Sequence, residues 1–305
     1  MPILRIKHVT TYRYAQPVKF ADHRLMCRPR DSHDLRLLDT GISISPPATL
    51  RWVHDVFSNS VLIASFADEA SELVFTSTVL AEHYPSAPDV DLVEEYAKTL
   101  PFSYDATEMP DLARSVERHY HDPENRVDAW VRKLRAELGS DDTLDVLVGI
   151  TQAIKAQFAY TARDEEGTQT PIQTLDLGSG SCRDFALFMM EAVRSLGLAA
   201  RFVSGYLYDE SLIGADGGVV GGGATHAWVQ VYLPGAGWVP FDPTNAIIGG
   251  SNLLRVAVAR DPSQAAPLSG SYIGPPDAYL GMTVQVDVSV EPAAAPATEQ
   301  RTGEN

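Results

Sequence analysis

The stretch Gly178-Ser179-Gly180-Ser181-Cys182-Arg183-Asp184-Phe185-Ala186 decides the fold, because a glycine-rich turn leads there into a helix that begins at a cysteine. Apolar residues recur after Cys182 at helical spacing, and Gly197 stands where a C-terminal glycine cap is expected. Ser181 and Asp184 fit the S-x-x-[DE] capping pattern, so we interpret Asp184 as a helix cap rather than a catalytic group. The helix N-terminus favours a thiolate and leaves the Cys182 amide free to bind an oxyanion.

His226 and Asp242 supply the partners that an activated cysteine needs. An imidazole takes the proton of the thiol, and a carboxylate fixes the tautomer of that imidazole. His226 stands in Thr225-His226-Ala227-Trp228, and Asp242 stands in Phe241-Asp242-Pro243-Thr244. We therefore predict that Cys182, His226 and Asp242 form a catalytic triad.

The pairing of two predicted strands brings His226 and Asp242 together. Residues 225–233 and 237–242 have the pattern of strands, and we place a three-residue loop at Leu233-Pro234-Gly235 with Gly235 left-handed. His226 then lies directly opposite Asp242, and a slip of one residue would separate the two onto opposite faces. The same register pairs Val229 with Val239 and Ala227 with Phe241. The polar face carries His226, Trp228, Gln230, Trp238 and Asp242.

The remaining patterns indicate an α+β chain. Alternating residues over 1–85, broken by turn chemistry, favour an antiparallel β-rich, sandwich-like N-terminal domain. Apolar residues from Leu144 to Phe158 have helical spacing, and residues 200–208 have the pattern of a further strand. The strict alternation from Met282 to Val290 predicts a strand that returns to the N-terminal sheet.

These patterns divide the chain into five segments. A proline-rich boundary near residue 85 separates the N-terminal domain from the rest of the chain. The predicted segments are the β-rich domain (1–85), a connector with helices (86–140), the catalytic core (141–250), a C-terminal segment with the returning strand (251–290) and a disordered tail (291–305).

Four ordered blocks resemble the bacterial transglutaminase-like superfamily of cysteine proteases. They are residues 180–186, 200–206, 226–228 and 237–245. Residues 12–14, 17–18, 28–30 and 55–59 are similar to the β-rich domain that often precedes that core, although Ser58 stands where this pattern usually has glycine. The resemblance implies a papain-like Cys182, His226, Asp242 triad that acts on amide bonds, with no cofactor and no metal.

The amino-acid composition argues against some classes of binding partner. The 305 residues are 45% hydrophobic and carry a net charge of -16, which argues against a nucleic-acid binder or a basic membrane-surface protein. The first residues lack the apolar core of a secretory signal, and no stretch is long enough to span a bilayer, so we expect a cytoplasmic protein. Its expected partner is a peptide or protein substrate. Cys27, without a nearby His or Asp signature, is interpreted as a small buried hydrophobe.

Several other residues are weaker candidates. His119 and His121 resemble a metal site, but a solvated helix end is the favoured interpretation. Trp228 and Trp238 either cover the site or pack in the core, and Tyr160 or Gln173 could supply a polar group to the oxyanion. The glycine-rich loop 214–223 is either a mobile lid or a plain connector.

The reaction itself has three interpretations. We favour hydrolysis of a peptide or isopeptide bond through a thioester, because no second, amine-binding cleft is evident. Acyl transfer to an amine is the first alternative, since the same thioester accepts either nucleophile. A binding module without turnover is the second, and the presence of all three triad residues argues against it.

Overall fold

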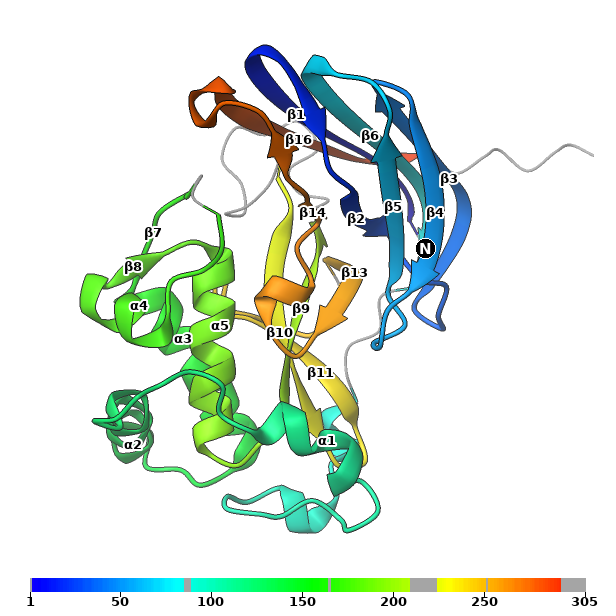
Figure 1. The fold of residues 1–305 in the computed structure, drawn as a ribbon. Helices are drawn as coiled ribbons and strands as arrows, with labels where there is room; N and C mark the ends of the chain where they lie inside the picture. Colours follow the sequence, from blue (N-terminus) through cyan, green and yellow to red (C-terminus); the bar gives the residue numbers. More distant parts are fainter. Residues whose placement is uncertain (1, 85–88, 164–165, 209–223, 251, 292–305) are drawn as a thin grey trace, which may run out of the picture.

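The chain folds into a β-sandwich and an α+β core that lie side by side (Figure 1). A computed structural model describes residues 2–84, 89–163, 166–208, 224–250 and 252–291. The predicted α+β class is confirmed, with the β-rich part formed by the beginning of the chain and completed by its end. Glu291, the first residue of the predicted tail (291–305), is the last residue of the final strand. Residues 292–305 and the glycine-rich loop 214–223 lie outside the described residues.

The sandwich is built from two antiparallel sheets around an apolar layer. Buried Leu62, Leu73 and Phe75 belong to this layer, as does Cys27, which is 4% exposed and confirms its interpretation as a buried hydrophobe. One sheet contains β1 (Ile3–Phe20), β3 (Leu35–Ser45), β6 (Ala70–His83), β15 (Tyr272–Ile273) and β16 (Tyr279–Glu291). The other contains β2 (His23–Arg28), β4 (Ala48–His54), β5 (Ser60–Phe66) and β14 (Leu268–Ser269).

The end of the chain closes the sandwich. β16 runs antiparallel along β1, from the pair Ile3 and Glu291 to the pair Tyr12 and Met282. The alternating stretch from Met282 to Val290 lies within this strand, and Val286 is its buried residue. Because β1 is held by β6 on its other side, both edges of the N-terminal strand are paired.

The core packs helices against one face of an antiparallel sheet. The strand order is β12 (Ile247–Ile248), β11 (Gly237–Asp242), β10 (His226–Leu233), β9 (Ala200–Leu207) and β13 (Leu253–Ala259). The helices are α1 (Met109–Val116), α2 (Arg126–Leu138), α3 (Thr143–Gln157), α4 (Pro171–Leu177) and α5 (Cys182–Ser195). β13 lies past residue 250, where the sequence predicts the core to end, because its apolar run completes this sheet.

Helix α5 is the central element of this core. Its Phe185, Phe188 and Met189 are fully buried against the sheet residues Ala227 and Val229. A short parallel pair, β7 (Ala159–Tyr160) and β8 (Ser179–Gly180), leads the chain into the helix. Four 3-10 turns complete the described elements: Val90–Leu92, Glu95–Ala97, Pro262–Gln264 and Pro276–Ala278. No helix in the described ranges combines the length and apolarity that crossing a membrane requires.

The predicted β10–β11 register is wrong by two residues. Val229 pairs with Phe241, and Val231 pairs with Val239. Pro234 and Gly235 occupy the central positions of a β-turn closed by a hydrogen bond from Ala236 N to Leu233 O, so Leu233 stays in its strand and pairs with Gly237. Gly235 is left-handed, with φ 86°, as expected.

The shift preserves the face of every side chain, because the side-chain period of a strand is two. His226 and Asp242 therefore share a face, as predicted, but they are diagonal neighbours rather than directly opposed. The opposite face contributes Ala227, Val229 and Phe241 to the core under α5.

Two histidine–tyrosine pairs join the sandwich to the core sheet. The Nδ1 atom of His8 lies 3.0 Å from the Tyr206 hydroxyl, and that of His83 lies 3.0 Å from the Tyr208 hydroxyl. Both histidines are buried, and burial lowers the pKa of His8 to about 4. The His8 imidazole is therefore neutral in the folded protein near neutral pH.

Acid should weaken the junction through His8. Its pKa is lower in the folded chain than in the unfolded chain, so its contribution is present above pH 6.5 and is lost as pH falls towards 4. A tenfold change in proton affinity is worth about 1.4 kcal/mol, so the loss should reach about 3 kcal/mol. Chemical denaturation at pH 7 and pH 4.5 should show a smaller loss for His8→Gln than for the natural chain. The same change at exposed His54 on β4 should leave the loss unaltered, and equal losses for both variants would contradict the assignment.

Candidate active site

Cys182 opens helix α5, as the sequence predicts. The preceding Ser181 has an extended backbone, with φ −88° and ψ 175°, and is the N-cap residue. The Cys182 side chain is nearly buried, with the residue 8% exposed. Since the first four N–H groups of a helix have no acceptor within the helix, the Cys182 amide has no intrahelical partner and lies next to its own sulfur.

The cap of α5 is the carboxylate of Asp184. Its Oδ2 accepts hydrogen bonds from the amide and the hydroxyl of Ser181, both at 2.8 Å. The interpretation of Asp184 as a cap is thereby confirmed. The same carboxylate accepts from Arg163 Nη1 at 2.8 Å and from the Gln169 amide at 2.7 Å, although Asp184 is fully buried. Asp184 therefore fixes both the helix start and the segment that approaches it.

His226 is the first residue of β10, and its ring bonds to Asp242 at the end of β11. The Nε2 atom lies 2.8 Å from Asp242 Oδ2, and both side chains are fully buried. Gly205 of β9 pairs with His226, and a β-carbon there would lie 2.1 Å from the Leu254 carbonyl oxygen. Close packing of β13 and the indole of Trp228 thus requires glycine opposite the histidine.

The carboxylate of Asp242 is held by the turn that comes after it. Its Oδ1 accepts from the Thr244 amide at 2.9 Å, and its Oδ2 accepts from the Asn245 side-chain amide at 2.8 Å. Aspartate commonly bonds to the backbone two residues further on. This arrangement leaves one lone-pair direction of Oδ2 for His226.

The charges of this buried pair stabilise each other. Burial by itself lowers the pKa of His226, but the charge of Asp242 and the hydrogen bond to it raise that pKa to about 10. Burial raises the pKa of Asp242, and the charge and bond of His226 outweigh this effect, so the net pKa is lowered. Near neutral pH the ring is therefore an imidazolium facing a carboxylate.

Cys182 meets the other side of the imidazole. The Cys182 side chain lies close enough to His226 to raise the pKa of the histidine. The ring nitrogen Nδ1 is buried and has no hydrogen-bond partner among the described residues. Because Nε2 is bonded to Asp242, Nδ1 is the ring nitrogen that remains available to Cys182. The structure thus brings the three predicted residues together in the order Cys182, His226, Asp242.

Tyr160 and Gln173 occupy different places. Tyr160 on β7 lies beside the site: its ring centroid is 6.4 Å from that of Phe185, and burial, followed by the charge of Cys182, raises its pKa. Gln173 instead closes the cap of α4, where its Oε1 accepts from the Thr170 amide at 2.8 Å. Of these two candidates, Tyr160 alone is next to Cys182.

The two tryptophans of the predicted polar face lie in different surroundings. Trp228 is 1% exposed and stacks on His226, with ring centroids 6.1 Å apart and planes at 24°. Trp238 lies further along the sheet, where the Arg201 guanidinium sits 4.0 Å from its ring centroid. Phe57 from the sandwich packs into the apolar cluster that contains Trp228. The sandwich thus contributes Phe57 to the packing on the face of the core sheet that carries Trp228.

His119 lies in the loop between α1 and α2 rather than at a helix end. Its Nδ1 lies 2.8 Å from Arg260 Nη1, and its Nε2 lies 3.0 Å from the Arg114 carbonyl. Its neighbour His121 is exposed. In the described ranges, no three His, Cys, Asp or Glu side chains group in a way that would hold a metal ion.

Asn245 and Arg163 are site residues that sequence reasoning did not assign. Asn245 comes after Asp242 in the run Asp-Pro-Thr-Asn, and such a run after a strand is a signal for a turn closed by the aspartate. Arg163 bonds to both oxygens of Asp184 at 2.8 and 2.9 Å. Its separation of 21 residues from Asp184 carries no local signal.

Comparisons with known proteins agree with this architecture. The model of the transglutaminase-like superfamily matches residues 112–243, and that of the bacterial transglutaminase-like N-terminal region matches residues 4–82. The uncharacterized protein Rv2569c of Mycobacterium tuberculosis is 27% identical over 290 residues, covering 92% of this chain and 91% of its own. ML0607 of Mycobacterium leprae, also described as uncharacterized, is 24% identical over 297 residues, covering 93% and 98%.

A solved structure shares the fold over nearly the whole chain. It is described as a "Putative Cysteine Protease" from Cytophaga hutchinsonii, and it superposes with a TM-score of 0.70. The sequence identity is 19%, and the alignment covers 96% of this chain and 92% of the other. The shared fold therefore includes both the sandwich and the core.

Proposed function

Because the chain belongs to the transglutaminase-like superfamily and carries the bacterial N-terminal region of that group, we propose that it is a thiol enzyme that cleaves amide bonds in peptides or proteins. The observation that carries the proposal is the buried His226–Asp242 bond with the free Nδ1 of His226 beside Cys182. A thiolate next to an imidazolium is the activated nucleophile of such enzymes.

The proposed reaction has two steps. The Cys182 sulfur attacks the carbonyl carbon of the amide and forms a C–S bond, and the C–N bond breaks as His226 Nδ1–H gives its proton to the leaving amine. A water molecule then attacks the thioester carbon and gives one proton to His226. The C–S bond breaks, the acid leaves, and the Cys182 thiolate and the His226 imidazolium are restored. Asp242 holds the ring so that Nδ1, rather than Nε2, faces the sulfur.

The developing oxyanion needs donors near the sulfur. The Cys182 amide is suited to this role because it is at the start of α5, where N–H groups have no acceptor within the helix. Tyr160 is the nearest candidate for a second donor, since its hydroxyl stays protonated at neutral pH and its ring lies at the site.

Alkylation with iodoacetamide tests whether the thiol is activated. At pH 6, Cys182 should react at least about tenfold faster than N-acetylcysteine, because a free thiol with a pKa near 8.5 is almost wholly protonated there. His226→Ala should remove most of this advantage. Mass spectrometry of the labelled peptides separates Cys182 from Cys27. A rate equal to that of the model thiol, unchanged in the variant, would contradict the proposal.

A peptide library with and without a labelled amine then distinguishes hydrolysis from acyl transfer. We expect hydrolysis products to exceed amine incorporation. Incorporation in excess would assign the chain to the acyl-transfer alternative. An alkylated Cys182 together with no turnover on any amide would instead favour the binding module.

A further inference from the structure

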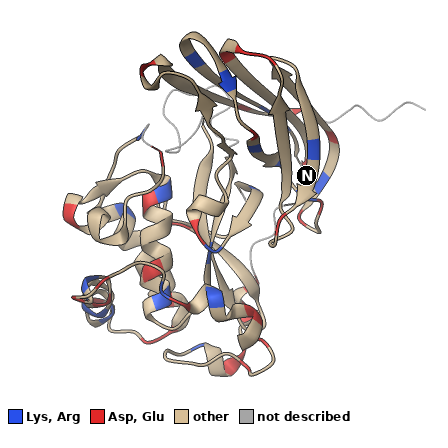
Figure 2. Cartoon of the chain, viewed as in Figure 1, with Lys and Arg blue, Asp and Glu red and all other residues tan. Residues whose placement is uncertain are grey.

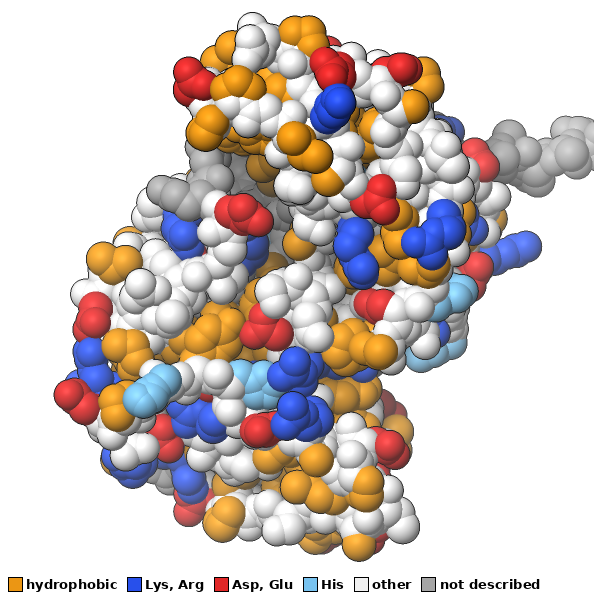
Figure 3. All heavy atoms as spheres, viewed as in Figure 1, with side chains coloured by type: hydrophobic (Ala, Val, Ile, Leu, Met, Phe, Trp, Pro, Cys, Tyr) orange, Lys and Arg blue, Asp and Glu red, His pale blue; other side chains and the backbone are white. Residues whose placement is uncertain are grey.

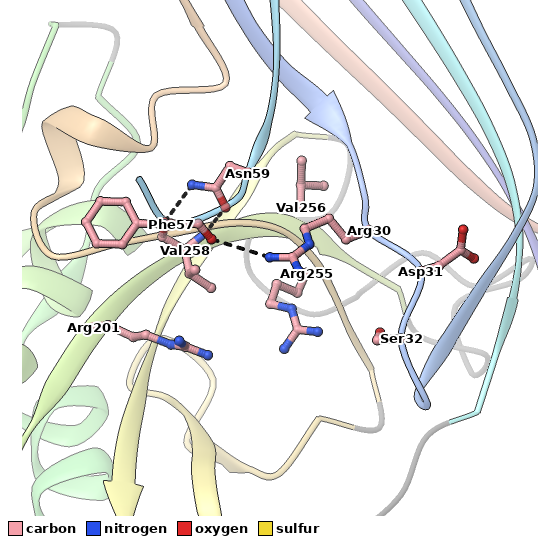
Figure 4. A pocket seen from close by; sticks show the side chains of 9 residues that line it. All are labelled: Arg30, Asp31, Ser32, Phe57, Asn59, Arg201, Arg255, Val256 and Val258. Carbon is pink, nitrogen blue, oxygen red and sulfur yellow. Dashed lines mark hydrogen bonds between the residues drawn. The ribbon is translucent and has the colours of Figure 1, made fainter. Parts of the chain in front are cut away.

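A pocket of about 190 Å³ lies where the sandwich meets the core sheet, and none of the residues lining it belongs to the Cys182 site. Arg201 of β9 and Arg255 of β13 line it from the core, and Arg30, which comes after β2, lines it from the sandwich (Figure 4). Phe57 and Asn59 of the β4–β5 turn also line it. We call this the arginine pocket.

Three guanidinium groups gather in a chain of net charge -16. Figure 2 shows Lys and Arg as well as Asp and Glu scattered over both parts of the chain, and the face drawn in Figure 3 carries both signs. Like charges at close range repel, so such a cluster costs free energy unless an anion compensates it.

Arg201 is the deepest of the three. Its Nε donates to Gln230 Oε1 at 2.9 Å, and its guanidinium lies over Trp238, so both contacts orient the group without neutralising it. Burial, followed by the charges of Arg255 and Arg30, lowers its pKa to about 9. Among the described residues, no carboxylate forms an ion pair with Arg201.

Little negative charge compensates the other two arginines. Arg30 donates to the Phe57 carbonyl at 3.3 Å, and Arg255 lies 3.7 Å from Asp34, a long ion pair. Asp31 also lines the pocket, but its carboxylate accepts from the Leu37 amide at 2.6 Å and points away from the guanidinium groups (Figure 4). The pocket therefore keeps a positive surplus.

The wall of the pocket is fixed before any ligand binds. Asn59 is 2% exposed, and its side chain bonds to both backbone groups of Val258, at 2.7 and 2.9 Å. This pair of bonds ties the sandwich turn to β13. At this turn Ser58 has a left-handed backbone, with φ 61°, which explains why the family pattern usually has glycine there.

We propose that the arginine pocket binds a phosphate group, either as inorganic phosphate or as part of a small organic molecule. Guanidinium forks match phosphate oxygens in paired hydrogen bonds, and a dianion compensates the surplus charge. Liquid water occupies about 30 Å³ per molecule, so the volume holds a phosphate and several further atoms. Apolar Val256 and Phe57 offer a surface for such atoms.

Isothermal titration calorimetry at constant ionic strength tests this site with two probes, inorganic phosphate and glycerol phosphate. We expect saturable binding of at least one of them to the natural chain, weakened at least tenfold by Arg201→Gln and by Arg255→Gln. Arg24→Gln, at an exposed position of β2 outside the pocket, is the matched control and should leave the affinity unchanged. Tenfold tighter binding of glycerol phosphate than of phosphate would identify organic phosphates as the ligand class, and equal affinity would identify the free ion.

Two results would overturn the proposal. One is no saturable heat from either probe up to about 10 mM, a concentration beyond useful affinity for a pocket with three guanidinium groups. The other is an affinity that neither arginine variant changes. Should Arg201→Gln fail to fold, Arg255→Gln decides, because the Arg255 side chain is 31% exposed and makes only a long ion pair with Asp34.

Discussion

Cys182→Ala should lower amide-bond turnover by a factor on the order of 10⁴ or more while the chain stays folded. The nucleophile forms the bond to the substrate, so its removal eliminates the thioester route and leaves only residual catalysis by binding and oxyanion donors. The cap of α5 does not depend on the sulfur, since Ser181 and Asp184 make its bonds. Initial rates on the best peptide of the library, together with a thermal unfolding curve, measure both expectations.

Cys27→Ala is the matched control for this change. Cys27 is 4% exposed and Cys182 is 8% exposed, so both substitutions remove one largely buried sulfur atom. Cys27 lies in the sandwich core, however, away from His226. Turnover should be unchanged in the Cys27 variant. Equal activity of the two variants would contradict the assignment of Cys182 as the nucleophile.

The parts of the site that were predictable depend on local signals. A cap, an apolar helical repeat and a C-terminal glycine lie within one short stretch, and they locate α5 at Cys182–Ser195. Strand alternation in the same way places His226 and Asp242 on one face of a hairpin. These features are short-range, so a single sequence contains the information that determines them.

The register of β10 against β11 was harder to predict, because it depends on which residues form the turn between them. The predicted loop is centred on Pro234, whereas the observed turn has Pro234 and Gly235 at its two central positions. Moving the centre of the hairpin by one residue changes the strand pairing by two residues. Proline favours the second position of a β-turn and left-handed glycine the third, and this preference fixes the observed pairing. Because the observed register differs from the predicted one by two residues, an even number, His226 and Asp242 still lie on the same face of the sheet.

Contacts between distant segments left no local signal at all. Asn59 and Val258 are 199 residues apart, and Arg163 and Asp184 are 21 apart. Neither pair can be deduced from periodicity or capping. The arginine pocket and the packing of Phe57 against the apolar cluster that contains Trp228 are of the same kind, since they exist only after the sandwich has packed on the core sheet.

Asp242→Asn should lower turnover about 10³-fold, although it changes a single atom. The Thr244 amide donates to Oδ1, so the carbonyl oxygen of an asparagine must take that position and its NH₂ must face His226 Nε2. Nε2 would then have to accept, which moves the ring proton to Nδ1 and removes the base that faces Cys182. The same exchange in a Ser-His-Asp enzyme lowers kcat about 10⁴-fold through the wrong tautomer.

The pH profile separates this positioning role of Asp242 from a general loss of structure. Imidazolium must protonate the leaving amine, so activity should fall as pH rises through the pKa of His226, which Asp242 raises to about 10. Without the carboxylate that pKa falls, so the alkaline limb should move to lower pH. Asp261→Asn is the matched control, because Asp261 also accepts from the amide two residues on, Ser263, at 3.0 Å but lies outside the site. An Asp242→Asn enzyme with an unmoved alkaline limb would show that the carboxylate does not orient His226.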